Sequence, residues 1–180
     1  SCESIGKAAF CDCSSLEKVN ISSACKSIGT IAFLNCKSLK EVNISSACTS
    51  IGESAFKDCT SLVKMNIPLL LTSINEYLFY NCKSLEEINI SSSVTMIKEY
   101  AFYGCKSLTR INIPSSIKVI KHGAFSQCLS LAKIALNNSS IKAINESCFF
   151  GCYSLVQILL PKSITEIKKF AFADWKSLVE

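Results

Sequence analysis

The sequence repeats itself every 23 residues, and this period restricts the possible folds more than any other feature of the chain. Repeats of about 20–50 residues indicate a solenoid, in which each unit buries its apolar side chains against its neighbours. One of the seven steps between repeats is 24 residues long. The period is carried by columns of phenylalanine (Phe10, Phe33, Phe56, Phe79, Phe102, Phe125, Phe149, Phe172), leucine (Leu16, Leu39, Leu62, Leu85, Leu108, Leu131, Leu155, Leu178) and isoleucine (Ile5, Ile28, Ile51, Ile74, Ile97, Ile120, Ile144, Ile167).

The longer step has a visible cause in a polar turn. Four residues separate Leu136 from Ile141, whereas three separate Ile113 from Ile117 one repeat earlier. Insertions are tolerated best in exposed turns. The extra residue therefore leaves the repeat otherwise intact.

The continuous repeat predicts a single domain over residues 1–180 with about eight 23-residue repeats. The terminal repeats of a solenoid usually carry a polar cap, and neither end of this sequence resembles one. We therefore expect the chain to be a fragment of a longer repeat protein.

One repeat, residues 85–107, illustrates the local structure that we expect. Leu85, Ile88 and Ile90 follow the alternating apolar pattern of a short strand, and three serines then form a turn. Residues 100–102 resemble one turn of helix. The strands would stack as one parallel sheet about 4.8 Å apart. Because helical turns are wider than strands, the stack would curve, with the sheet on the concave side and short helical turns on the convex side.

Composition predicts neither a membrane span in this segment nor a nucleic-acid partner. The apolar fraction is 49%, but no run reaches the length of about 18 residues that a transmembrane helix needs, so no membrane span is predicted. The net charge of +5 comes from scattered lysines. Nucleic-acid binding needs a concentrated basic patch, and none is present in the sequence.

The repeat unit L-x-x-I-x-I-P-x-S-V-x-x-I-x-x-x-A-F-x-x-C-x-S resembles the BspA-type leucine-rich repeat, as residues 108–130 show well. The resemblance covers the whole chain and implies an α/β leucine-rich-repeat solenoid, a right-handed superhelix. It also implies a surface protein of bacteria or protists that serves adhesion and ligand binding. The departures are Cys2, Cys25 and Cys48 in place of valine, Leu78 and Cys148 in place of alanine, and Trp175 in place of cysteine.

The twelve cysteines are predicted to be buried free thiols. Cysteine behaves as a small buried hydrophobe, and an odd-numbered column cannot pair fully within itself. We also expect cysteines one coil apart to lie beyond the limit of roughly 7 Å between Cα atoms for a disulfide. The spacing lacks the close pairs of a structural zinc site, so no metal is predicted. The main column is Cys13, Cys36, Cys59, Cys82, Cys105, Cys128 and Cys152, and the second is Cys2, Cys25 and Cys48.

The exposed strand positions form the candidate binding surface. One column alternates in sign over its first five members, which favours either a self-neutralising ladder or a recognition surface. The next column is asparagine until Ala135 and Leu159, and exposed apolar residues beside polar ones often mark a contact site. We therefore expect Leu159 to be the best single candidate for partner contact. The columns are Lys18, Glu41, Lys64, Glu87, Arg110, Lys133, Gln157 and Glu180, and Asn20, Asn43, Asn66, Asn89, Asn112, Ala135 and Leu159.

No catalytic arrangement is predicted, and no cofactor. The sole histidine, His122, occupies a position held by Glu99 and Glu146 in neighbouring repeats, where we expect it to be solvated. A Cys–His pair would need an accessible thiol with a lowered pKa beside it. The glycines form no phosphate-binding loop, and Gly6, Gly29 and Gly52 share one repeat position where they relieve the backbone.

These observations favour a protein-binding repeat module rather than an enzyme. The resemblance implies adhesion or ligand recognition at a cell surface. The free cysteines favour the alternative, an intracellular structural scaffold that docks into a larger protein assembly, because free thiols suit a reducing compartment.

Overall fold

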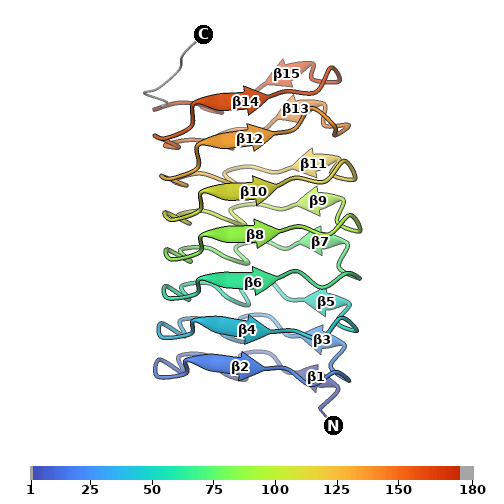
Figure 1. The fold of residues 1–180 in the computed structure, drawn as a ribbon, viewed down its shortest axis with the longest axis vertical. Helices are drawn as coiled ribbons and strands as arrows, with labels where there is room; N and C mark the ends of the chain where they lie inside the picture. Colours follow the sequence, from blue (N-terminus) through green and yellow to red (C-terminus); the bar gives the residue numbers. More distant parts are fainter. Residues whose placement is uncertain (1, 175–180) are drawn as a thin grey trace.

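The computed structural model describes residues 2–174, in which the chain winds into a stack of coils (Figure 1). Each coil contributes a three-residue strand on one side, which we call a front strand, and a two-residue rear strand on the other. The front strands are β2 (Lys18–Asn20), β4 (Glu41–Asn43), β6 (Lys64–Asn66), β8 (Glu87–Asn89), β10 (Arg110–Asn112), β12 (Lys133–Ala135) and β14 (Gln157–Leu159). The rear strands are β1 (Ser4–Ile5), β3 (Ser27–Ile28), β5 (Ser50–Ile51), β7 (Ser73–Ile74), β9 (Met96–Ile97), β11 (Val119–Ile120), β13 (Ala143–Ile144) and β15 (Glu166–Ile167).

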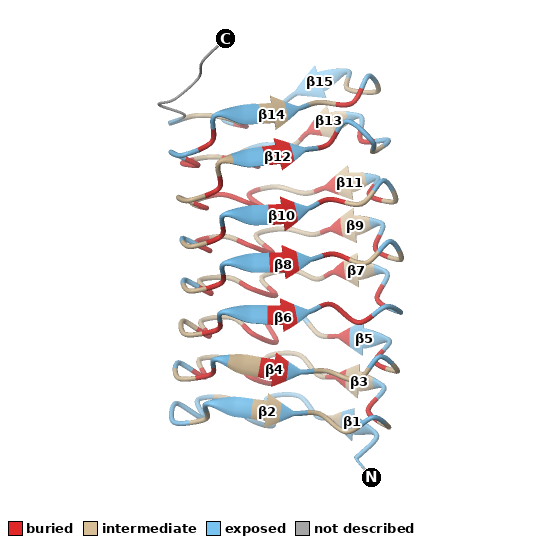
Figure 2. Ribbon diagram, viewed as in Figure 1, coloured by how far each residue is buried: buried red, intermediate tan, exposed pale blue. Residues whose placement is uncertain are grey.

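The front strands follow the predicted alternation. The middle residue points into the stack, as with Val42, Met65 and Ile88, which are buried, while the residues on either side face outward (Figure 2). Neighbouring front strands pair in parallel one repeat apart, so that Ile88 lies beside Ile111. The 23-residue period therefore sets the register.

The core is a ladder of stacked phenylalanine rings. Phe33 to Phe149 are each 0–1% exposed, and neighbouring rings of the column from Phe10 to Phe172 lie 5.0–6.0 Å apart between centroids. The ring planes differ by at most 13°. Each ring thus packs against the coil before and the coil after it. Leu178 and Trp175 lie outside the described residues.

The predicted helical turns are wrong, because residues 2–174 contain no helix. The segment between each rear strand and the next front strand, which we call the arc, is a chain of tight turns. Each arc contains two residues with positive φ, four positions apart, such as Ala8 at 56° and Asp12 at 60°. A residue in the left-handed region ends a helix, so two of them within one arc prevent helical winding.

Hydrogen bonds between arcs explain this conformation. Alternate amides of each arc donate to the next coil rather than along their own, as Phe10 does to the carbonyl of Ala32 at 2.8 Å. The arc is therefore joined to its neighbours like a strand. The fold is a β-solenoid of about seven turns rather than an α/β solenoid, and residues 2–174 contain no wide helical turns that would bend the stack.

The predicted single parallel sheet is interrupted. The front strands form a five-stranded sheet from β2 to β10 and a separate pair, β12 with β14. The rear strands are likewise unpaired between β11 and β13, and also between β5 and β7. The joint between the coil of β10 and the coil of β12 therefore lacks pairing on both sides, in the part of the chain that the structure describes.

The extra residue lies at this joint. In other turns a serine hydroxyl bonds to the preceding coil, as Ser116 does to Val94 O and Ser163 to Ile141 O, each at 2.6 Å. After β12, the hydroxyl of Ser139 instead bonds to Leu136 O of its own coil at 2.7 Å. The insertion thus replaces a contact between coils with one inside a coil.

An asparagine side chain bridges each interruption of the rear sheet. Where the rear strands pair, a backbone amide makes the hydrogen bond to the preceding coil, as Lys98 N does to Ile74 O at 2.9 Å. At the two interruptions the amide nitrogen of Asn75 lies 2.6 Å from Ile51 O, and that of Asn145 lies 2.7 Å from Ile120 O. A longer side-chain donor therefore spans coils whose backbones do not pair.

Candidate binding surface

The structure places all fourteen candidate residues within the described range on the front strands. Glu41 is half-buried and the others are exposed; the remaining member of the charged column, Glu180, lies outside the described residues. The front face is the outer surface of β2 to β14. The candidates are Lys18, Asn20, Glu41, Asn43, Lys64, Asn66, Glu87, Asn89, Arg110, Asn112, Lys133, Ala135, Gln157 and Leu159.

Polar contacts between side chains gather at the β2 end of the front face. Lys18 forms an ion pair with Glu41 at 3.1 Å, and Asn43 donates to Asn20 at 2.8 Å and to Glu41 at 2.9 Å. The hydrogen bond from Asn43, together with Lys18, lowers the pKa of Glu41. The predicted charge and asparagine ladders are thus formed between β2 and β4, and these groups are engaged with one another.

The same columns make no such contacts farther along the described face. Lys64 lies in register between Glu41 and Glu87 without an ion pair within 4.0 Å in residues 2–174. Its charge is nevertheless balanced by carboxylates on both adjacent strands. Opposite charges on neighbouring strands attract weakly even without direct contact.

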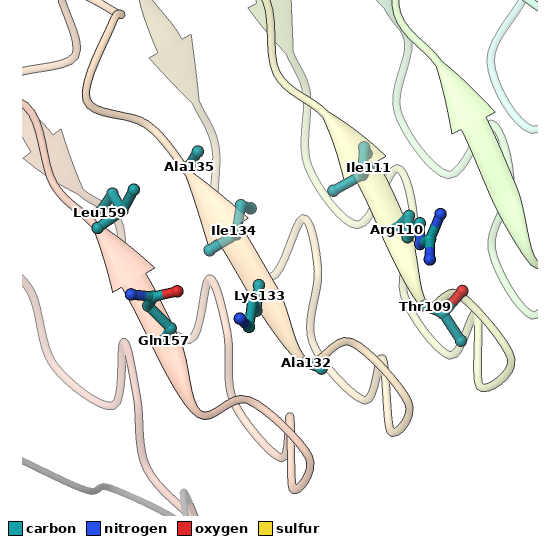
Figure 3. Close-up of a pocket in the computed structure, with 9 residues that line it drawn as sticks. All are labelled: Thr109, Arg110, Ile111, Ala132, Lys133, Ile134, Ala135, Gln157 and Leu159. Carbon is teal, nitrogen blue, oxygen red and sulfur yellow. The ribbon is translucent and has the colours of Figure 1, made fainter.

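A hollow opens where the front sheet is interrupted. It has a volume of about 390 Å³ and spans β10, β12 and β14. Figure 3 shows Arg110 on the β10 side and Lys133 on the β12 side, with Ala135 and Leu159 at the ends of their strands. The hollow therefore joins cationic and apolar groups on one surface.

Ala135 and Leu159 are not the only apolar residues at this end of the front face. Val156 is 42% exposed and Leu159 44% exposed, and Ala132 also lines the hollow. The column that holds Ala132 and Val156 carries an ion pair at the other end of the face, where Lys40 lies 2.9 Å from Glu17. Sequence reasoning missed this third column, whose members nearest the hollow are uncharged. The column reads Glu17, Lys40, Val63, Glu86, Thr109, Ala132 and Val156.

A second exposed apolar group lies in a turn. Leu69 and Leu70, which follow β6, are 68% and 53% exposed. Leu69 also borders a smaller hollow of about 240 Å³ with Asn66 and Asn89. These two leucines are more exposed than Leu159 and Val156, but the hollow beside them is smaller than the one at β10–β14 and has no charged side chain in its lining.

The arc face carries an aromatic cluster that the sequence analysis did not identify. Tyr77 stacks on Tyr100 at 5.4 Å and Tyr80 on Tyr103 at 4.6 Å, and Lys57 lies 4.9 Å from the centre of the Tyr80 ring. The signal was present as two tyrosines three positions apart in consecutive repeats.

His122 belongs to this cluster and is half-buried, which corrects the expectation that it is simply solvated. The hydroxyl of Tyr100 lies 2.6 Å from its Nε2. A Cβ at the adjacent Gly123 would lie 2.5 Å from the Tyr100 ring, so glycine leaves room for this contact. In the described residues the hydrogen-bond partner of His122 is therefore a tyrosine and not a thiol.

The main cysteine column forms hydrogen bonds across coils. From the second coil on, each thiol donates to the carbonyl of the phenylalanine in the preceding coil, as Cys36 does to Phe10 O at 3.1 Å and Cys105 to Phe79 O at 3.2 Å. The other pairs are Cys59 with Phe33, Cys82 with Phe56, Cys128 with Phe102 and Cys152 with Phe125. The column therefore links coils through weak hydrogen bonds as well as by packing.

All twelve cysteines are free, and nine are buried. Burial raises the pKa of Cys152 to about 12 and that of Cys82, Cys128 and Cys148 well above the usual range. Because the thiolate is the reactive form, we expect these buried thiols to react slowly with oxidants and alkylating agents. The expectation of burial is wrong for Cys13 and Cys2, which are exposed in the first coil.

We expect alkylation of the native protein to separate these two groups. Iodoacetamide should modify Cys13 and Cys2 rapidly and Cys11 more slowly, because its hydrogen bond to Asp12 raises the pKa of the Cys11 thiol. The nine buried thiols should stay unmodified until the protein unfolds. Peptide mapping by mass spectrometry measures each site, with a sample in denaturant as the control. Equal native labelling of Cys105 and Cys13 would contradict this account.

No group of three or more His, Cys, Asp or Glu side chains is placed to hold a metal ion among the residues that the structure describes. Across those same residues, no helix has the length and apolar character to cross a membrane.

A stack of 23-residue coils with parallel front and rear strands and a buried leucine column is the solenoid of a leucine-rich-repeat protein. The family described as BspA type leucine rich repeat region matches residues 1–94 and 72–180, in six copies. The chain belongs to this family. Leucine-rich-repeat proteins are in general interaction modules and not enzymes.

Solved structures of bacterial proteins share the fold. A T. pallidum leucine-rich-repeat protein is 27% identical with a TM-score of 0.61, and the match covers 91% of this chain and 66% of that one. A leucine-rich-repeat protein from Bacteroides ovatus is 23% identical with a TM-score of 0.52, covering 98% and 69%. The pneumococcal vaccine antigen PcpA is 16% identical with a TM-score of 0.52, covering 92% and 59%.

The last two likenesses support the fold alone. The chain spans 66–69% of the length of the first two proteins. Among curated proteins, none matches the chain.

Proposed function

We propose that this chain is a protein-binding module for adhesion or ligand recognition, and that the β10–β14 part of its front face contacts the ligand. The observation that carries this proposal is the exposure of Leu159, which lines the hollow, and of Val156, which directly precedes β14. Exposed apolar surface next to polar groups is typical of protein contact sites.

The contrast within the front face supports this assignment. Lys18, Glu41 and Asn43 bind one another at the β2 end, so a partner would have to break those contacts to use them. At the β14 end the apolar side chains have no such contacts to lose, and covering them releases water. For the same buried area, the β14 end of the front face therefore offers a partner more binding free energy than the β2 end.

Leu159→Asp is expected to weaken partner binding about tenfold or more, because it places a charge where an apolar contact should form. The partner would be identified by photo-crosslinking from position 157, purified, and its dissociation constant measured by calorimetry. Since Leu159 is 44% exposed, the substitution should leave the circular dichroism spectrum and the unfolding midpoint nearly unchanged.

Asn66→Asp is the matched control. Asn66 is an exposed residue of the same column on β6, so the change adds the same charge away from the hollow. Equal binding by the Leu159→Asp and wild-type proteins would reject the proposed surface, as would equal weakening by both substitutions.

A further inference from the structure

The cationic side chain of Lys133 has no carboxylate in register on either side. Its partner on β14 is Gln157, and across the interruption stands Arg110. Neither Lys133 nor Arg110 forms an ion pair within the described residues. By contrast, Lys64 has Glu41 and Glu87 in register on the two adjacent strands. Arg110 has Glu87 in register on β8, so Lys133 is the cation of the hollow that no carboxylate in register on the described strands balances.

The position of this charge favours a ligand that also brings apolar groups. Lys133 and Arg110 border the same hollow as Ala132, Ala135 and Leu159. A ligand that covers the apolar groups also removes water from around the ammonium group. An unpaired cation then becomes costly, whereas a carboxylate against it gains strength from the reduced screening.

The spacing along β12 favours an extended polypeptide as the ligand. Lys133 and Ala135 are two residues apart on one strand and both face outward. In an extended chain, residues i and i+2 also face one side, at the same separation of about 6.6 Å. A segment lying along β12 would set an acidic side chain over Lys133 and an apolar side chain over Ala135 and Leu159.

The interruption adds backbone groups that a peptide can use. β10 and β12 are not paired in the described structure, so this step lacks the ladder hydrogen bonds that β12 forms with β14. Unpaired N–H and C=O groups next to a hollow bind water or a ligand with a polar backbone.

We propose that the hollow between β10 and β12 binds an extended, acidic segment of a partner protein. In this segment an acidic and an apolar residue stand two positions apart. The carboxylate lies against Lys133 and Arg110, and the apolar side chain lies on Ala135 and Leu159. This inference rests on the proposed function and names the chemistry of the ligand at the same surface.

Three end-blocked peptides of twelve residues test the inference by titration, with binding read from amide chemical shifts. The first repeats Glu-Ser-Leu, the second replaces glutamate with glutamine, and the third repeats Glu-Leu-Ser-Ser, which changes the spacing of acid and apolar residue. We expect the first to bind about tenfold or more tightly than the second, because hydrogen bonds to charged groups are stronger than neutral ones. The third should also bind more weakly than the first, and the shifts should centre on β12.

Reversing the charge of Lys133 tests whether the peptide binds at this hollow in particular. Lys133→Glu should remove binding of the Glu-Ser-Leu peptide and allow binding of a Lys-Ser-Leu peptide. Lys64→Glu is the matched control, since Lys64 is exposed in the same column on β6, and it should leave the affinity within about twofold. Equal weakening by both substitutions would overturn the inference, because it would indicate attraction to net charge rather than to this hollow.

The outcomes also separate this inference from the proposed function. If the glutamate and glutamine peptides bind equally and Leu159→Asp removes both, the acidic ligand is rejected while the surface stands. If none of the peptides binds, the acidic segment is rejected, and the effect of Leu159→Asp on the cross-linked partner alone decides the proposed function.

Discussion

Phe79→Ala is expected to lower the free energy of unfolding by about 3–5 kcal/mol, the usual loss when a buried phenylalanine is truncated. Phe79 is fully buried and stacks on Phe56 at 6.0 Å and on Phe102 at 5.4 Å. In a stack where each coil contacts only its neighbours, no distant part of the core can compensate. Urea unfolding followed by circular dichroism measures the loss.

Phe10→Ala is the control within the same column. The Phe10 ring is 38% exposed and stacks on Phe33 alone in the described residues, at 5.0 Å. We expect less than half the loss found for Phe79→Ala. A loss of similar size at both positions would mean that the ladder does not carry the stability assigned to it.

The second large effect is expected from Gly52→Ala, which should cost about 1–3 kcal/mol or more, the range for forced overpacking. A Cβ at Gly52 would lie 2.4 Å from Thr30 N and 2.6 Å from Gly29 C, both backbone atoms of the preceding coil. Backbone cannot rotate away as a side chain does. Two coils would have to separate, and the unfolding midpoint in urea should fall accordingly.

Gly6→Ala provides the comparison at the same repeat position. No heavy atom lies within 4 Å of a Cβ there. The change should leave stability the same or raise it by up to about 1 kcal/mol, because alanine restricts the unfolded chain. If Gly6→Ala and Gly52→Ala destabilise the protein equally, the close approach of the coils is not the cause.

The sequence predicted the features that repeat. The phenylalanine, leucine and isoleucine columns mark the core, and Val42 or Ile88 at the centre of a strand could be placed inside by alternation alone. The front-face positions of Lys133 and Leu159 followed from the same register. These features depend on the period and on which side a residue faces, and both can be read from a single chain.

The predictions that were wrong concern features that depend on contacts between coils. Tyr100 and its neighbours look like a helical turn, because the sequence does not reveal that their amides donate to the next coil. The interruption of the front sheet lies beside one inserted residue near Ser139, and the pairing of strands across it depends on geometry that the sequence does not show. The position of His122 is held by glutamate in the neighbouring repeats, which predicts a solvated side chain, and its partner Tyr100, 22 residues away in sequence, could not be inferred from the repeat.

The joint between the coils of β10 and β12 also differs from the others in what holds it together. Across it, the arc bonds persist, such as Phe125 N to Cys148 O at 2.9 Å, and Asn145 bonds to Ile120 O, while neither the front nor the rear strands pair. A ligand seated in the hollow would contact β10 and β12 at once. Binding would therefore add contacts across a joint that strand pairing does not hold, and would stabilise the stack there.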